Sequence, residues 1–156
     1  MSYDLESILT DVLAVMTDNL NTKITAINTE KNDSITIGQV SSSSYFLDLD
    51  SKSSNHDPVV LYGIADVQNE AIGPATSKIV TIGVSIIKND NGINPNIVKQ
   101  MLRYGRALEE IFQDKFKNKR AWGDFKVDVL PVLSFLRSDV SQRYKIVGIN
   151  IITTLA

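Results

Sequence analysis

Apolar residues recur every three or four positions in two stretches of the chain, and each stretch predicts a helix with one face in a core. In residues 3–20 the stripe is Leu5, Ile8, Leu9, Val12, Leu13, Met16 and Leu20. In residues 95–117 it is Ile97, Met101, Tyr104, Leu108, Ile111 and Phe112. The second helix is also marked by Asn94, a capping residue, followed by proline at the first helical position.

Gly105 falls inside the second predicted helix. Glycine costs about 1 kcal/mol relative to alanine in a helix interior, so its presence favours close approach of another backbone. The first helix or a neighbouring subunit is the expected source of that backbone.

Alternating apolar and polar residues predict strands in the rest of the chain. The clearest strand is 79–87, in which Val80, Ile82, Val84 and Ile86 point to one side. Runs at 23–28 and 34–38 predict a hairpin, and further strands are expected at 43–49, 58–64, 125–129 and 144–155. The polar stretches 50–58 and 68–77 predict connections rich in turn residues.

Two features constrain how the strands are arranged. Pro131 follows the strand at 125–129 and favours a sheet edge, a bulge or the end of that strand. The last strand-like run of the chain is rich in β-branched residues, low in charge and free of proline. It must therefore be a central strand or be covered by a neighbouring subunit.

The order helix, strands, helix, strands predicts an α+β fold, with two helices packed on one face of a mainly antiparallel or mixed sheet. At 156 residues and 43% hydrophobic content, the chain fits one domain spanning residues 1–156. No apolar run approaches the roughly 20 residues needed to cross a bilayer, and the N-terminus lacks the positive charge of a secretory signal. We therefore expect no membrane association.

The residues offer little for catalysis. The chain has no cysteine and one histidine, His56, in its most polar segment. Asp48, Asp50 and Asp57 lie nearby but match no calcium-loop spacing, and no phosphate-binding or dinucleotide-binding glycine motif occurs. A net charge of -2 disfavours direct binding to nucleic acid. We expect no enzyme activity, cofactor or metal, while a small-ligand-binding module and a hydrolase using loop carboxylates remain alternatives.

Several segments resemble the tail terminator, or tail completion, proteins of long-tailed bacteriophages. The resemblance extends over nearly the whole chain in the succession of helices and strands. Its local matches are residues 103–111, the terminal 149–154, 58–63, and the later Gly73–Pro74.

The resemblance implies an assembly function. Such a protein forms a homohexameric ring on the last ring of tail tube protein, stops tube polymerisation and offers a surface to the head–tail connector protein. In contractile tails it also meets the tail sheath. DNA passes through the lumen without sequence-specific binding, and the protein, made in the host bacterial cytoplasm, ends in the virion. Another neck, sheath-associated or baseplate subunit is the nearest alternative.

A closed ring needs two different complementary patches on each subunit. The hypothesis places Arg103 and Arg106 in one patch and Glu109 and Glu110 in the other; the alternative is a solvated helix face with intrahelical ion pairs. The residues expected in loops that face a partner or the lumen are Asp48, Asp50, His56, Asp57, Gly73 and Pro74.

Charge reversal at Arg106 separates the two interpretations of the helix face. If Arg106 lies in a subunit interface, Arg106→Glu abolishes rings in light scattering coupled to size exclusion, because like charges then meet across the contact. A solvated face tolerates the change, so unchanged rings would contradict the interface hypothesis.

Overall fold

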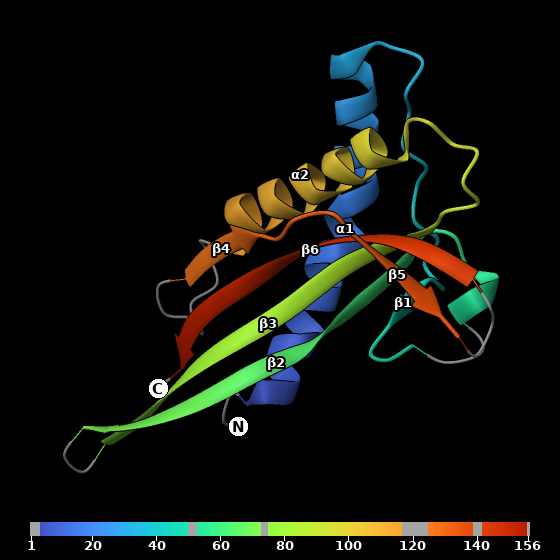
Figure 1. Ribbon diagram of the computed structural model, residues 1–156. Coiled ribbons are helices and arrows are strands. Elements are labelled where there is room, and N and C mark those ends of the chain that lie inside the picture. Colours follow the sequence, from blue (N-terminus) through green and yellow to red (C-terminus); the bar gives the residue numbers. More distant parts are fainter. Residues whose placement is uncertain (1–3, 50–52, 73–74, 117–124, 139–141, 156) are drawn as a thin grey trace.

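The computed structural model describes residues 4–49, 53–72, 75–116, 125–138 and 142–155. Two helices lie on one face of a six-stranded, mostly antiparallel sheet (Figure 1), which confirms the predicted α+β class. The elements in chain order are α1 (Leu5–Lys31), β1 (Tyr45–Phe46), a 3-10 turn (Ser53–Asn55), β2 (Val59–Ile72), β3 (Ala75–Asn89), α2 (Ile97–Phe116), β4 (Phe125–Val129), β5 (Leu133–Arg137) and β6 (Gln142–Leu155).

The sheet has the strand order β1-β2-β3-β6-β4, and β5 also pairs with β6. β3 and β6 are antiparallel partners from Lys78↔Leu155 to Asn89↔Tyr144, so the final strand is central. Of the two explanations for its apolar sequence, a central strand within the monomer is the one observed. The inner residues of β3, from Val80 to Ile86, and those of β6, including Ile149 and Ile151, share one buried cluster with both helices.

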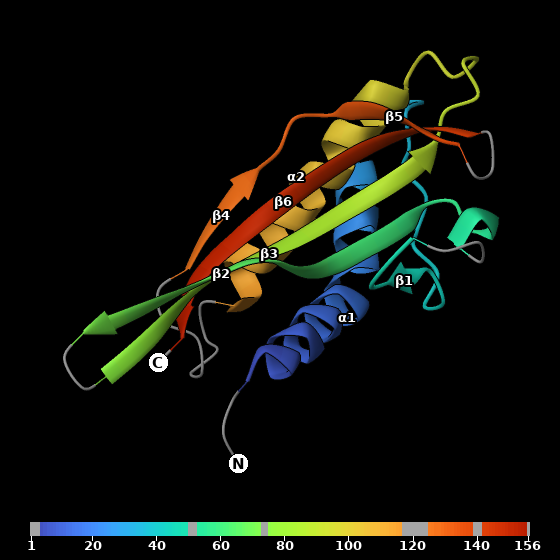
Figure 2. The ribbon, with the colours of Figure 1, turned by 60° about the horizontal axis from the view of Figure 1, so that its bottom comes forward.

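β4 and β5 together form one outer edge of the sheet, running in succession along β6 (Figure 2). From Val129 to Leu133 this edge advances four residues while β6 advances three, from Ile149 to Ile146. The extra residue makes a bulge, and it occurs where Pro131 supplies no backbone N–H for the ladder. Pro131 was expected to mark a sheet edge, a bulge or the end of the strand, and it follows the end of β4 at Val129, on the outer edge and within the bulge.

α1 extends eleven residues further along the chain than predicted, ending at Lys31 instead of residue 20. The predicted hairpin of 23–28 and 34–38 is therefore wrong. Ile24 and Ile27 continue the apolar stripe of α1 and are buried, so helical periodicity outweighs the short alternating pattern. Residue 34 lies in a bend, and residues 35–38 belong to no helix or strand.

Two asparagines hold the segment after α1 against that helix. The Asn28 side chain donates to the carbonyl of Ile37 at 2.9 Å and accepts from its backbone N–H at 3.0 Å. Asn21, two helical turns earlier, makes the same pair of bonds with Val40, at 2.9 and 2.7 Å. Each amide thus replaces a strand partner, and the side chains of Ile37 and Val40 are buried in the core.

The predicted connection at 68–77 is also wrong, because its described residues form the distal part of a long hairpin. β2 pairs with β3 up to Ile72↔Ala75, whereas β6 accompanies β3 only from Lys78 onward. The distal part of the hairpin therefore projects past the sheet as a two-stranded arm (Figure 1). Residues 68–70 are polar and typical of turns, yet they pair in the strand. An exposed strand lacks the buried apolar face by which a strand is recognised in the sequence.

Gly105 lets α2 lie close to β6. A Cβ at this position would stand 2.9 Å from Cγ2 of Val147 and 4.0 Å from Cγ1 of Val129. The close neighbour is thus a side chain of the sheet, instead of the backbone of α1 or a second subunit that the sequence suggested. Tyr104 and Leu108 beside it are fully buried.

Gly105→Ala should destabilise the fold by about 1–3 kcal/mol, because overpacking outweighs the gain of helix propensity. Adding Val147→Ala should recover part of the loss, which makes the pair non-additive in urea unfolding. Additive effects of the two substitutions would show that Gly105 is not needed for this contact.

Candidate functional site

Arg103, expected at a subunit interface, is engaged inside the monomer. Its guanidinium donates to both carboxylate oxygens of Asp33, at 3.0 and 2.7 Å, and also to the carbonyl of Ile35. The residue is only 9% exposed. Arg103 thereby ties the middle of α2 to the chain that follows α1.

Arg106 and Glu110 belong to a second set of intramolecular ion pairs. Arg106 donates to both carboxylate oxygens of Glu30 and, at 3.1 Å, to Glu110. Lys23 lies 3.5 Å from Glu110. Glu109 is half-buried on another side of α2. Three of the four predicted interface residues therefore connect α2 to α1 and its continuation, and their role between subunits stays a prediction.

These ion pairs change what the Arg106→Glu test measures. Reversal would place a new carboxylate beside those of Glu30 and Glu110, which destabilises the monomer as well as any interface. A melting curve must therefore accompany the assembly measurement.

The candidate loop residues fall into two groups. His56 lies 3.0 Å from the hydroxyl of Ser44 through Nδ1, and its ring meets Phe46 edge-on at 5.2 Å. Asp57 accepts from the backbone N–H of Asn89 at 3.0 Å and lies 3.6 Å from Lys88. Both side chains thus hold the loop to the sheet, whereas Asp48 is exposed. Asp50, Gly73 and Pro74 lie outside the described residues.

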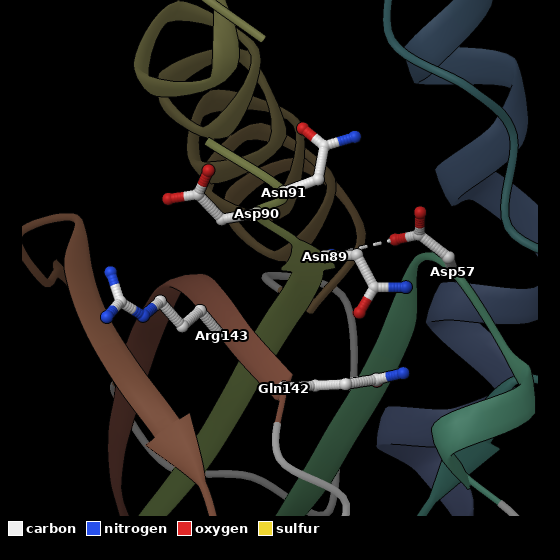
Figure 3. A pocket seen from close by; sticks show the side chains of 6 residues that line it. All are labelled: Asp57, Asn89, Asp90, Asn91, Gln142 and Arg143. Carbon is white, nitrogen blue, oxygen red and sulfur yellow. Dashed lines mark hydrogen bonds between the residues drawn. The ribbon is translucent and has the colours of Figure 1, made fainter. Parts of the chain in front are cut away.

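A polar cavity of about 550 Å³ lies where β3 ends and β6 begins. Figure 3 shows its lining, which consists of Asp57, Asn89, Asp90, Asn91, Gln142 and Arg143. The carboxylate of Asp90 accepts from the N–H of Gly92 at 3.0 Å and lies 3.8 Å from Lys145. A small-molecule site normally has mainly apolar walls with a few polar anchors, and this cavity has the opposite character.

Exposed apolar side chains gather on the β4–β5 edge, which the sequence analysis did not single out. Of the eight large hydrophobic residues exposed in the described part of the chain, four lie along this edge. They are Val129, Leu130, Leu133 and Leu136, between 37% and 62% exposed. Val129 ends the alternating run at 125–129, whereas Leu130, Leu133 and Leu136 follow it without alternation and predicted no strand. Only the position of β4 and β5 at the edge reveals the exposure of these side chains.

The opposite edge of the sheet is also open. β1 pairs with β2 only at Val60 and Leu61, and over the described residues β2 beyond Leu61 has β3 as its one strand partner. Among the described residues, no strand pairs with the outer N–H and C=O groups of β2 beyond Leu61, and such an edge can accept another strand. The sheet thus ends in two chemically different edges.

Within the described ranges, no group of three or more His, Cys, Asp or Glu side chains is placed to hold a metal ion. No helix in that part of the chain is long and apolar enough to span a membrane. Models of known protein families give no match to the chain, and neither do the curated proteins.

The ion pairs between the helices predict a pH dependence of stability. Hydrogen bonds from Arg106 and Arg103 lower the pKa values of Glu30 and Asp33 below their ordinary values of 4.5 and 3.8. A lowered folded-state pKa adds stability above the unfolded pKa, and that stability is lost as the pH falls through the folded value. The melting temperature should therefore fall on acidification from pH 6 to about 3.

The matched variant is Glu30→Gln with Asp33→Asn. Its melting temperature should be lower than that of wild type at pH 6 but should fall less on acidification. Asp18→Asn, an exposed carboxylate on the same helix, serves as control and should keep the wild-type slope. If the melting temperature, measured by circular dichroism, falls equally with pH in wild type and the double variant, these ion pairs have no such role.

Proposed function

We propose that this protein is a structural virion protein whose copies form a closed ring, hexameric by its resemblance to tail terminators, at the head-proximal end of a phage tail tube. The ring stops tube polymerisation and presents a new surface to the head–tail connector. It is not an enzyme and uses no cofactor. Its partners are other copies of itself, the tail tube protein, the connector and, in a contractile tail, the sheath.

The observation that carries the proposal is the apolar, open edge formed by β4 and β5. Leu133 and Leu136 are 57% and 62% exposed there, and the strand that bears them pairs on one side only in the described structure. An open edge with apolar side chains is an association surface unless something covers it. A second copy of the chain would cover it.

The rest of the architecture agrees with a ring protein. A heterologous contact requires two different surfaces, and the sheet has two unlike edges. The projecting arm of the β2–β3 hairpin (Figure 1) extends away from the sheet and is suited to reach an adjoining ring. Exposed Asp48 would add negative charge beside a DNA path and disfavour adhesion to phosphate.

Leu133→Lys with Leu136→Lys should disrupt assembly while leaving the monomer folded, because both side chains are exposed and the changes desolvate charge in the contact. Ile93→Lys, at a residue 81% exposed in the loop before α2, is the matched control. Sedimentation velocity should show rings for wild type and control, and smaller species for the double variant. If the double variant still forms rings, the β4–β5 edge is not a contact between subunits.

A further inference from the structure

The two open edges of the sheet are antiparallel to each other. β2 is antiparallel to β3, β3 to β6, and β6 to β4, and three reversals leave β2 and β4 running in opposite directions. Rotation of one copy about an axis roughly along the strands would therefore bring β4 beside the β2 of its neighbour in antiparallel orientation, the more favourable ladder.

The register of the sheet places the free part of β2 at the same level as β4. Phe125 is paired with Thr153, Thr153 with Val80, and Val80 with Val67. At the other end of β4, Val129 connects through Ile149 and Val84 to Tyr62. Residues 62–67, which begin where the pairing with β1 ends, thus lie across the sheet from β4.

One row of residues paired across the four strands has opposite charges at its two ends. Asp66 pairs with Thr81, Thr81 with Ile152, and Ile152 with Lys126. Asp66 is exposed, and the Lys126 side chain is 71% exposed, with Asp128 at 3.3 Å. Within the strand segments of β1 and β2 the charged residues are Asp66 and Glu70, both acidic. The edges are therefore complementary in charge at this row.

The neighbouring rows are apolar and complementary as well. Val127 connects through Ile151 and Ile82 to Ile64, and both end residues pack partly buried against the core on the helix side. Joining the edges would continue the core across the contact, from Val127 of one copy to Ile64 of the next. Lys126 and Asp66 would meet on the opposite, helix-free face.

From this register we infer that β4 of one copy adds to residues 62–67 of β2 in the next copy, with Lys126 opposite Asp66. This contact deepens the proposed ring and rests on that proposed function. It gives every subunit one donor edge and one acceptor edge, so the sheet continues from copy to copy. Each open edge is thus covered by the opposite edge of a second copy of the chain.

Cysteine cross-linking tests the contact directly, because the chain has no cysteine of its own. Directly opposite residues of an antiparallel pair have Cβ atoms about 4.5–5.5 Å apart, close to the distance that a disulfide spans. Within one copy the two positions are separated by three strand spacings, about 14 Å, which prevents an internal bridge. Asp66→Cys with Lys126→Cys should therefore give a ladder of covalent multimers after mild oxidation.

The controls are the two single-cysteine variants and the pair Asp48→Cys with Lys126→Cys, which uses another exposed acidic position. Single variants should yield no species beyond dimers, and the control pair should give no ladder. Circular dichroism verifies that each variant is folded.

Charge exchange provides an independent measurement. Asp66→Lys or Lys126→Glu alone should weaken self-association roughly fivefold at low salt, because like charges then lie opposite each other. The combined variant should restore it. Lys99→Glu, at an exposed lysine on α2, is the matched control and should leave association unchanged.

The outcomes separate this inference from the proposed function. A ladder together with restored association in the exchanged variant supports the contact. Rings that form without a ladder and are insensitive to charge exchange overturn the contact and leave the ring function standing. A wild-type chain that stays monomeric at every concentration overturns both.

Discussion

The packing of α2 against β6 positions both helices on the sheet. At Gly105 the side chain of Val147 fills the space that a Cβ would take, at 2.9 Å. This contact places Tyr104 and Leu108 in the core. α1 then packs beside α2, and the pairs of Arg103 with Asp33 and Arg106 with Glu30 fix the far end of α1. The position of α2 thus determines that of the whole helical layer.

The helical layer covers one face of the sheet but leaves its edges uncovered. α2 packs over β6, β4 and β3, and α1 beside it contacts β2, which completes the core of the monomer. In the described structure β4, β5 and the part of β2 beyond Leu61 each have a strand partner on one side only. Charged residues and Pro131 limit uncontrolled pairing at these edges. The apolar side chains kept there, Leu133 and Leu136 among them, are unfavourable in an isolated monomer and useful in a defined assembly. This contrast is the physical basis for proposing a ring.

The sequence predicted those parts of the fold that have a strong period. The stripe of α2, the alternation of β3 and the apolar run of β6 appear as expected, because each has a face buried in the common core. The first helix was predicted to end at residue 20, but α1 continues, and the Asn21 amide binds the backbone of Val40, 19 residues away. A partner so distant leaves no local signal. For the same reason the hairpin at 23–28 and 34–38 was predicted where α1 continues.

The candidate site was less predictable than the fold. Arg103 and Arg106 have the spacing of an exposed helix face, and their partners Asp33 and Glu30 lie about 70 residues earlier in the chain. Conversely, the exposure of Leu133 and Leu136 depends on strand order, which periodicity does not determine. The row that joins Asp66 to Lys126 requires the register of three strand pairs.

Copies of this chain are proposed to close into a ring. The most direct measurement is the mass of the unmodified protein in solution over a range of concentrations, by light scattering coupled to size exclusion, with negative-stain images of the main species. A ring should give one discrete multiple of the 17.3 kDa chain, six by the resemblance, and ring-shaped particles with a central opening. A 17.3 kDa monomer at all concentrations, or open chains of indefinite length, would contradict it.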